Sequence, residues 1–213
     1  MSIVDKALGA LTPPESEEKR EEARRKAHEA AGEGDWLSLA LQHHDQIRAA
    51  FEDCRQATEP GERMKAMKRL SLVLNGHSLA EEVVLYPAMA KAGEKGSADL
   101  AYTEQTTAKM QMAELERIAP ATDDWREKIE HIRGAVLHHM YEEEDHWFIR
   151  LKEEYPDQAF LTRRFREEYE RYARPEDLGR YEGRSAADGE ELLTESESRT
   201  WDMAENRADP GMQ

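Results

Sequence analysis

The stretch "GHSLAEEVVLYP", residues 76–87, places His77 four residues before Glu81 in what otherwise reads as an apolar helix. Residues four apart lie on the same face of a helix, about one turn from each other. The imidazole and the carboxylate therefore share a face with Leu74 and Val84, which is predicted to be buried. Burying ionisable groups is costly unless partners compensate for it, so this stretch indicates a specific site inside a helical core.

A second copy of this pair occurs in "HHMYEEEDHWF", residues 138–148. Here His139 and Glu143 follow the apolar stripe of their helix, whereas His138 and Glu142 fall on a stripe of charged residues that faces water. A third histidine, His44, lies on the apolar stripe of an earlier predicted helix. Two predicted helices thus bury a His-x-x-x-Glu pair, and a third buries a single histidine.

The spacing of these histidines predicts an internal repeat. His44 and His77 are 77 − 44 = 33 residues apart, and the same step back from His139 reaches position 106, next to Gln105. Gln105 lies on the apolar stripe of its predicted helix and should point into the core, whereas Glu104 falls on the polar side. Residue 105 should therefore lie close to the site, on the His139 side.

Apolar periodicity predicts an all-α protein with an antiparallel up-down four-helix bundle and extra helical segments at both ends. The bundle helices are expected at 36–57, 63–93, 97–119 and 125–154. Four parts follow along the chain: a charged, solvated helical arm (1–35) whose helix Ser16 caps, the bundle (36–155), a further amphipathic helix (156–175) and an acidic, largely flexible tail (176–213).

Composition narrows the function classes. The 213-residue chain carries a net charge of −16, which disfavours nucleic acid and anionic membrane surfaces as partners. No apolar run approaches the roughly 18 residues of a spanning helix, so no membrane segment is expected. The single cysteine, Cys54, cannot form an internal disulfide, and this predicts a cytoplasmic protein.

Three histidines and two glutamates that converge in a core predict a metal site. Mixed imidazole and carboxylate ligands suit iron, zinc or manganese. Two carboxylates that face each other across a bundle can bridge a pair of ions about 3.5–4 Å apart. The two buried carboxylates in this sequence are Glu81 and Glu143.

The motifs "HHDQIRAAF" (43–51), "HSLAEEVVLYP" (77–87) and "HHMYEEEDHWF" (138–148) resemble helices one, two and four of the hemerythrin-like (HHE) cation-binding family. The resemblance covers roughly residues 36 to 155. It implies a non-haem centre of two iron ions with an oxo or hydroxo bridge. The implied ligands are His44 and His77 on one iron, His139 on the other, and Glu81 and Glu143 bridging both.

The third helix departs from the family pattern, because Glu104 and Gln105 stand where Glu-His is usual. Glutamine offers only a neutral carbonyl oxygen, a weaker iron ligand than imidazole. Tyr102 lies one turn earlier on nearly the same face. It either supplies a phenolate to the second ion or packs with its hydroxyl hydrogen-bonded elsewhere.

The resemblance leaves several functions open. One is binding of O2 for transport, storage or sensing, and another is a di-iron oxidase or peroxide-consuming enzyme. A third is an iron- or oxygen-responsive regulatory protein without turnover, and a zinc or manganese storage or structural protein is a further alternative. Because the third helix lacks its histidine, a conventional reversible O2 carrier is disfavoured. We therefore interpret the sequence as that of a di-iron protein that reacts with O2 or peroxide.

Overall fold

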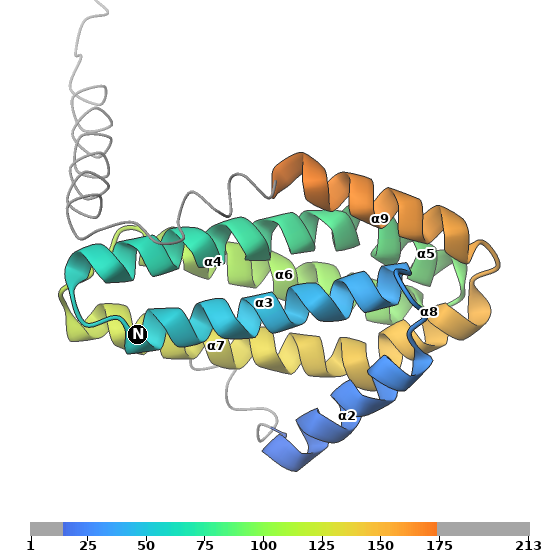
Figure 1. Ribbon diagram of the computed structural model, residues 1–213, viewed down its shortest axis with the longest axis horizontal. Coiled ribbons are helices and arrows are strands. Elements are labelled where there is room, and N and C mark those ends of the chain that lie inside the picture. The colour runs from blue at the N-terminus through green and yellow to red at the C-terminus, as the bar shows by residue number, and fades with distance from the viewer. Residues whose placement is uncertain (1–14, 174–213) are drawn as a thin grey trace, which may run out of the picture.

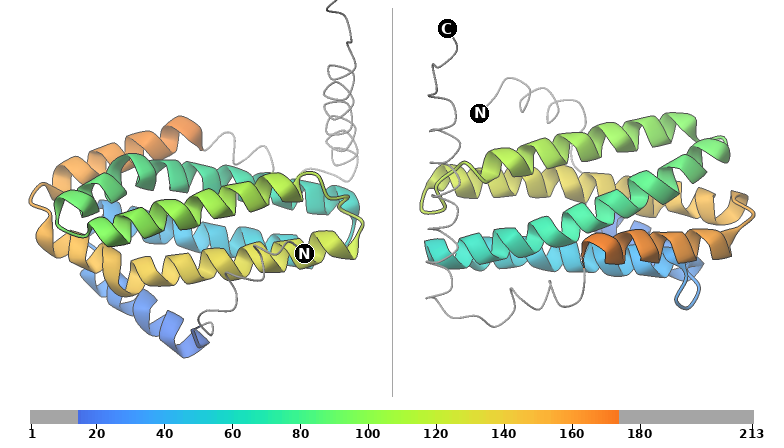
Figure 2. Two further views of the ribbon diagram at one scale, coloured as in Figure 1. Left: turned by 180° about the vertical axis from the view of Figure 1, so that it is seen from behind. Right: turned by 90° about the horizontal axis from the view of Figure 1, so that it is seen from above.

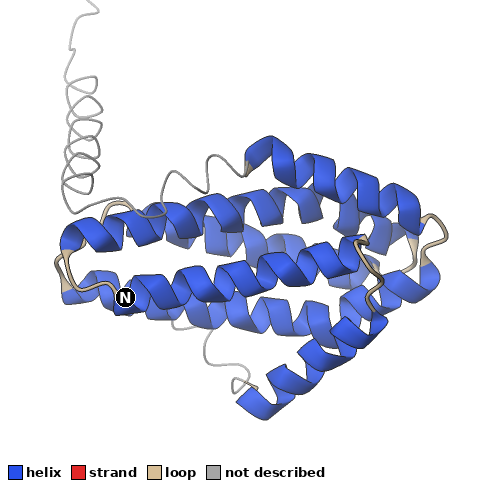
Figure 3. Cartoon of the chain, in the orientation of Figure 1, coloured by secondary structure: helices blue, strands red, loops and turns tan. Residues whose placement is uncertain are grey.

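The computed structural model describes residues 15–173, and all regular elements in this range are helical (Figure 3). Four long helices lie side by side, and consecutive ones run in opposite directions (Figures 1 and 2). These are α3 (Trp36–Gln56), α4 (Pro60–Ala80), α6 (Lys95–Leu115) and α7 (Asp123–Glu142). The predicted all-α bundle is confirmed.

Local sequence signals explain where three of these helices begin. The Asp35 side chain accepts a hydrogen bond from the backbone of Ser38 and caps α3. Pro60 stands at the start of α4, where its missing N–H costs nothing. The Thr122 side chain accepts from the backbone of Trp125 and caps α7. The loops between consecutive bundle helices are short, and they therefore keep the two helices of each antiparallel pair aligned.

Two π-helical turns interrupt the second and fourth predicted helices. Between α4 and α5 (Tyr86–Lys91) lies η1 (Glu81–Leu85), and between α7 and α8 (Phe148–Glu154) lies η2 (Glu143–Trp147). The helices predicted over 63–93 and 125–154 are present, and each contains one of these π-helical turns, which a 3.6-residue pattern does not predict. Each turn begins at the glutamate of a His-x-x-x-Glu pair, and π-helical insertions are common at functional sites.

Two outer helices cover the bundle. Helix α2 (Glu17–Ala30) packs against η2 and α3 through the fully buried Ala23 and Ala27, while most of its charged side chains are exposed. Ser16 caps α2, as predicted. Helix α9 (Gln158–Tyr172) lies along α4 on the other side (Figures 1 and 2). Residues 1–14 of the predicted arm and the predicted tail lie outside the described residues.

The buried apolar side chains form two clusters. One includes Trp36, Tyr86 and Phe148 near the π turns, and the other includes Phe51 and Ile132 farther along the bundle. The polar residues singled out from the sequence lie between these clusters along α3, α4 and α7. None of the described helices is long and apolar enough to span a membrane.

Candidate metal centre

The five predicted ligands are all buried, and each lies on a different element. They are His44 on α3, His77 on α4, Glu81 at the start of η1, His139 on α7 and Glu143 at the start of η2. His139 is the most exposed of them, at 7 %. Amphipathic periodicity alone therefore identified a single layer of ionisable groups inside the bundle.

Four of these residues, His44, His77, Glu81 and Glu143, each place a possible ligand atom within 4.8 Å of the others. Nε2 of His44 lies 3.3 Å from Oε2 of Glu143, and Nε2 of His77 lies 3.1 Å from Oε1 of Glu81. Among the described residues, none of these four buried atoms has a hydrogen-bond partner. Unsatisfied buried polar atoms are rare and need an explanation. Two imidazole nitrogens and two carboxylate oxygens facing one another fit a metal ion.

His139 lies on the other side of the two carboxylates. Its Nε2 is 3.2 Å from Oε1 of Glu143, and its Nδ1 is 2.8 Å from Oε2 of Glu104. The sequence predicts Glu104 on the polar side of its helix, and its side chain is 22 % exposed, yet its carboxylate reaches inward to His139. Glu104 is therefore the group that fixes the orientation of the His139 ring.

Tyr86 stands at the centre of the His139 side and was missed by the sequence analysis. Its hydroxyl donates toward Oε1 of Glu143 at 3.0 Å and Oε2 of Glu81 at 3.2 Å. The same oxygen lies 3.1 Å from Nε2 of His139. Tyr86 follows Glu81 by five residues, and the π turn brings residues at this spacing together. The Tyr-Pro ending of the motif was the available signal.

Gln105 and Tyr102 have different surroundings. Gln105 is 4 % exposed, and its Nε2 donates to Oε2 of Glu81 and to the Tyr86 hydroxyl. The hydroxyl of Tyr102 instead donates to the backbone carbonyl of Glu82 at 2.6 Å. Gln105 thus reaches the carboxylate layer, whereas the Tyr102 hydroxyl is engaged outside it, as the packing interpretation expects.

Glu144 is a second functional residue that the sequence analysis missed. It is 1 % exposed, and its Oε1 lies 2.6 Å from Nδ1 of His44 and 2.7 Å from Nη2 of Arg48. A carboxylate on the outer nitrogen fixes the ring of a histidine and directs its other nitrogen inward. Three consecutive glutamates, 142–144, gave no sign of which one would turn to His44.

The carboxylates and burial set the charge states of this layer. Burial lowers the pKa of His44, but the nearby Glu143 and Glu144 outweigh it and raise that pKa to about 9. Burial likewise opposes charge on Glu143, yet His139 and His44 hold its pKa well below the usual range. Burial and the charges of Glu143 and Glu81 raise the pKa of Tyr86 well above its ordinary value. The Tyr86 phenol is therefore protonated at neutral pH.

His43, beside His44, lies on the α9 side of the layer. Its ring stacks on Tyr169 of α9 at 3.6 Å between centroids, and it meets the His77 ring edge-on at 5.7 Å. Burial lowers the pKa of His43 well below its ordinary value, so the ring is neutral. His43 flanks the site, and α9 closes that side of it with aromatic rings.

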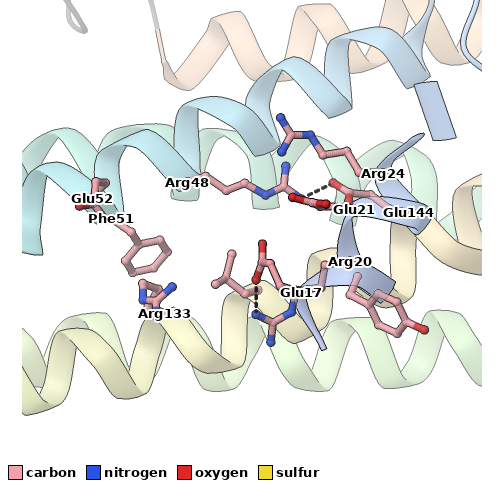
Figure 4. A pocket seen from close by; sticks show the side chains of 11 residues that line it. Glu17, Arg20, Glu21, Arg24, Arg48, Phe51, Glu52, Arg133 and Glu144 are labelled. Atoms are coloured by element: carbon pink, nitrogen blue, oxygen red, sulfur yellow. Dashed lines mark hydrogen bonds and ion pairs between the residues drawn. The ribbon is translucent and has the colours of Figure 1, made fainter. Parts of the chain in front are cut away.

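A cavity of about 210 Å³ lies between α2, α3 and α7 (Figure 4). Arg48 and Glu144 pair inside it, and Arg20, Arg24 and Arg133 also line it. None of the four convergent ligand-type residues lines this cavity. Of the residues that line this cavity, Glu144 is the one that hydrogen-bonds to a predicted ligand, His44.

Comparison with known proteins agrees with this geometry. The hemerythrin HHE cation binding domain matches residues 37–151. A DNA nickase of Nostoc sp. (strain PCC 7120 / SAG 25.82 / UTEX 2576) is 23 % identical over 109 residues, which cover 51 % of this chain and 31 % of the nickase. The chain thus spans about a third of that relative's length. No solved structure matches the chain.

Proposed function

Because this chain belongs to the hemerythrin HHE cation-binding family, we propose that its buried layer holds iron and reacts there with O2 or peroxide. The observation that carries the proposal is the set of four convergent ligand-type atoms on His44, His77, Glu81 and Glu143, none of which has a hydrogen-bond partner within residues 15–173. Iron held by imidazole and carboxylate groups supplies redox chemistry toward oxygen species.

The surrounding residues prepare the site for this role. Glu144 holds the His44 ring so that Nε2 faces the carboxylates, and Arg48 holds Glu144 in turn. Apolar and aromatic side chains such as Phe148 and Phe165, both fully buried, exclude bulk water. Charges interact more strongly in such a dry environment, which favours tight binding of a cation between Glu81 and Glu143.

The nicking activity named for the cyanobacterial relative is not part of this proposal. This chain covers 31 % of that protein, and its net charge of −16 opposes the approach of a polyanion. A small neutral molecule such as O2 or hydrogen peroxide meets no such repulsion.

Metal analysis and the optical spectrum of aerobically purified protein test the proposal. We expect iron in the native protein, a visible or near-ultraviolet ligand-to-metal band, and a spectral change when hydrogen peroxide is added to the reduced protein. Zinc or manganese in place of iron would favour the storage or structural alternative. Iron whose spectrum responds to O2 without consuming peroxide or a reductant would favour the regulatory alternative.

His77→Ala and His138→Ala form a matched pair for this test. His77 offers an unpartnered nitrogen to the site, whereas His138 bonds to Glu15 on the outer face of α7. Iron content and peroxide consumption should be lost in the first variant and kept in the second. Peroxide consumption that survives in iron-free His77→Ala would contradict the proposal.

A further inference from the structure

The two helical hairpins offer two equivalent metal positions, one on each side of Glu81 and Glu143. Residue spacing defines the equivalence, since 139 − 77, 143 − 81 and 148 − 86 all equal 62, and 105 − 44 = 61. The corresponding pairs are His44 and Gln105, His77 and His139, Glu81 and Glu143, and Phe148 and Tyr86. The first position lies beside His44 and His77, and the second lies beside Gln105 and His139.

The first position has ligand atoms without partners. Nε2 of His44, Nε2 of His77, Oε1 of Glu81 and Oε2 of Glu143 face it, and no described residue hydrogen-bonds to them. The aromatic residue on this side is Phe148, whose ring lies 5.9 Å from the His44 ring and carries no polar atom. The four atoms face one another instead, with Nε2 of His44 3.3 Å from Oε2 of Glu143 and Nε2 of His77 3.1 Å from Oε1 of Glu81.

The second position is filled by the protein itself. The Tyr86 hydroxyl contacts the remaining oxygens, Oε2 of Glu81 at 3.2 Å and Oε1 of Glu143 at 3.0 Å, and also Nε2 of His139 at 3.1 Å. Nε2 of Gln105 donates to the same hydroxyl oxygen at 2.6 Å. The two carboxylate oxygens and the imidazole nitrogen that would bind a second ion are thus already hydrogen-bonded, whereas Oε1 of Gln105 has no hydrogen-bond partner among the described residues.

The chemistry of Gln105 and Tyr86 opposes a second ion. Gln105 turns its amide nitrogen to this position, and an amide N–H group is a donor that cannot bind a metal ion. Tyr86 is fully buried, and its ring packs edge-on against Tyr102 with centroids 5.1 Å apart. The hydroxyl therefore cannot leave without opening the core around it.

We propose that the chain binds one metal ion, held by His44, His77, Glu81 and Glu143, and that the Tyr86 hydroxyl takes the place of a second. This inference rests on the proposed iron site and concerns the number of ions. His139 then acts as a positioning residue, because it contacts Tyr86 and Glu143 while Glu104 fixes its ring. Of the two metal positions that the resemblance implies, this chain would then use one.

The number of ions bound by the full-length protein tests this proposal. The metal is removed with a chelator, the protein is titrated with ferrous iron under anaerobic conditions, and bound iron is counted by mass spectrometry after gel filtration. Zinc serves as a second probe that undergoes no redox change. We expect one ion per chain with either metal. After oxidation, a single ferric ion gives a half-integer-spin electron paramagnetic resonance signal, whereas an oxo-bridged ferric pair is coupled and silent.

Three variants test whether Tyr86 holds the second position. Tyr86→Phe combined with Gln105→His removes the hydroxyl and supplies the missing imidazole, so this double variant should bind two ions. Tyr102→Phe is the matched control, because its hydroxyl bonds to the Glu82 carbonyl, and it should bind one. The single Tyr86→Phe variant should bind at least one ion, since Tyr86 is no ligand of the first position. Circular dichroism checks that each variant stays helical.

The outcomes separate the two proposals. Two ions per wild-type chain would overturn the inference, and a drop from two ions to one in Tyr86→Phe would show in addition that the tyrosine is a ligand. A double variant that folds and still binds one ion would overturn the assignment of Tyr86 as the occupant of the second position. Wild-type protein that binds neither iron nor zinc would refute the proposed function itself.

Discussion

The two halves of the metal centre share an outer ion pair and differ in their inner contacts. On the His44 side, Arg48 pairs with Glu144 at 2.7 Å, and on the Gln105 side, Lys109 pairs with Glu82 at 2.6 Å. Glu144 also reaches an inner ring, that of His44, whereas Glu82 bonds to no inner side chain in the hydrogen bonds described for this part of the chain. The two halves thus share a helical scaffold. The His44 side presents ligand atoms for a metal ion, whereas the corresponding atoms on the Gln105 side are hydrogen-bonded within the protein.

Two exchanges between the repeats account for this difference. Histidine at position 44 becomes glutamine at 105, and phenylalanine at position 148 becomes tyrosine at 86. The first exchange replaces an imidazole nitrogen with an amide donor, and the second adds a hydroxyl that reaches both carboxylates. Two side chains thus decide whether a position in this scaffold is left for an ion or closed by the protein.

The largest expected effect is the loss of metal from the His44 side. His77→Ala or Glu81→Ala removes a ligand and should weaken metal affinity by more than the roughly 10- to 100-fold typical of outer partners. Thermal stability should also fall, because an ion whose free concentration is about 100 times its dissociation constant stabilises the folded state by about 2.7 kcal/mol. Metal analysis and calorimetry measure both effects.

His139→Ala is the matching change on the other side and sharpens the comparison. It removes a contact to Tyr86 and Glu143 but no atom of the first position. Metal content should therefore survive in His139→Ala at a reduced affinity. If His139→Ala loses its metal as completely as His77→Ala does, both halves supply ligands. This result would contradict the proposed difference between the two halves.

The next effect comes from exchanging the aromatic pair. Phe148→Tyr adds a hydroxyl on the His44 side. On the Gln105 side, the equivalent Tyr86 hydroxyl reaches both carboxylates. We expect metal binding to fall toward zero while the bundle stays folded, at a cost of about 1–3 kcal/mol for the extra atom in a packed core. Metal counting and thermal denaturation check this, and undiminished metal content would break the proposed equivalence.

Helical periodicity carried most of what could be predicted. The stripes placed His44, His77 and His139 in the core because α-helices repeat every 3.6 residues, and the step of 33 residues led to Gln105. The cap at Ser16 was predictable for the same local reasons. These features depend on residues within a few turns of one another.

The missed features depend on contacts that a 3.6-residue pattern does not contain. Tyr86 reaches the site because η1 adds a residue to one turn, and Glu144 does so through η2. Glu104 turns inward because a neighbouring helix offers His139. Helix α2 has a weak apolar stripe, yet small Ala23 and Ala27 allow it to pack closely. In each case, tertiary packing decided the outcome.

The outer ion pairs give a smaller, matched effect. Glu144→Gln weakens the hold on His44 Nδ1 and on Arg48, so metal affinity should drop by about 10- to 100-fold. Glu82→Gln breaks the equivalent pair with Lys109 but touches no ligand-type nitrogen, so affinity should change little. Competition titration with a chelator of known affinity measures both. An equal loss of metal affinity in the two variants would mean that Glu144 acts through its negative charge rather than through its hydrogen bond to His44.

The smallest expected effect is that of Tyr102→Phe, which tests whether the Gln105 side has any phenolate ligand. The Tyr102 hydroxyl donates to the Glu82 carbonyl at 2.6 Å, and losing such a bond costs about 1 kcal/mol. The melting temperature should therefore fall slightly, while the number of ions and the visible spectrum stay as in the wild type. If the variant instead loses a visible charge-transfer band, Tyr102 binds metal as a phenolate. The Gln105 side would then have to rearrange around an ion, and the contrast between the two halves would disappear.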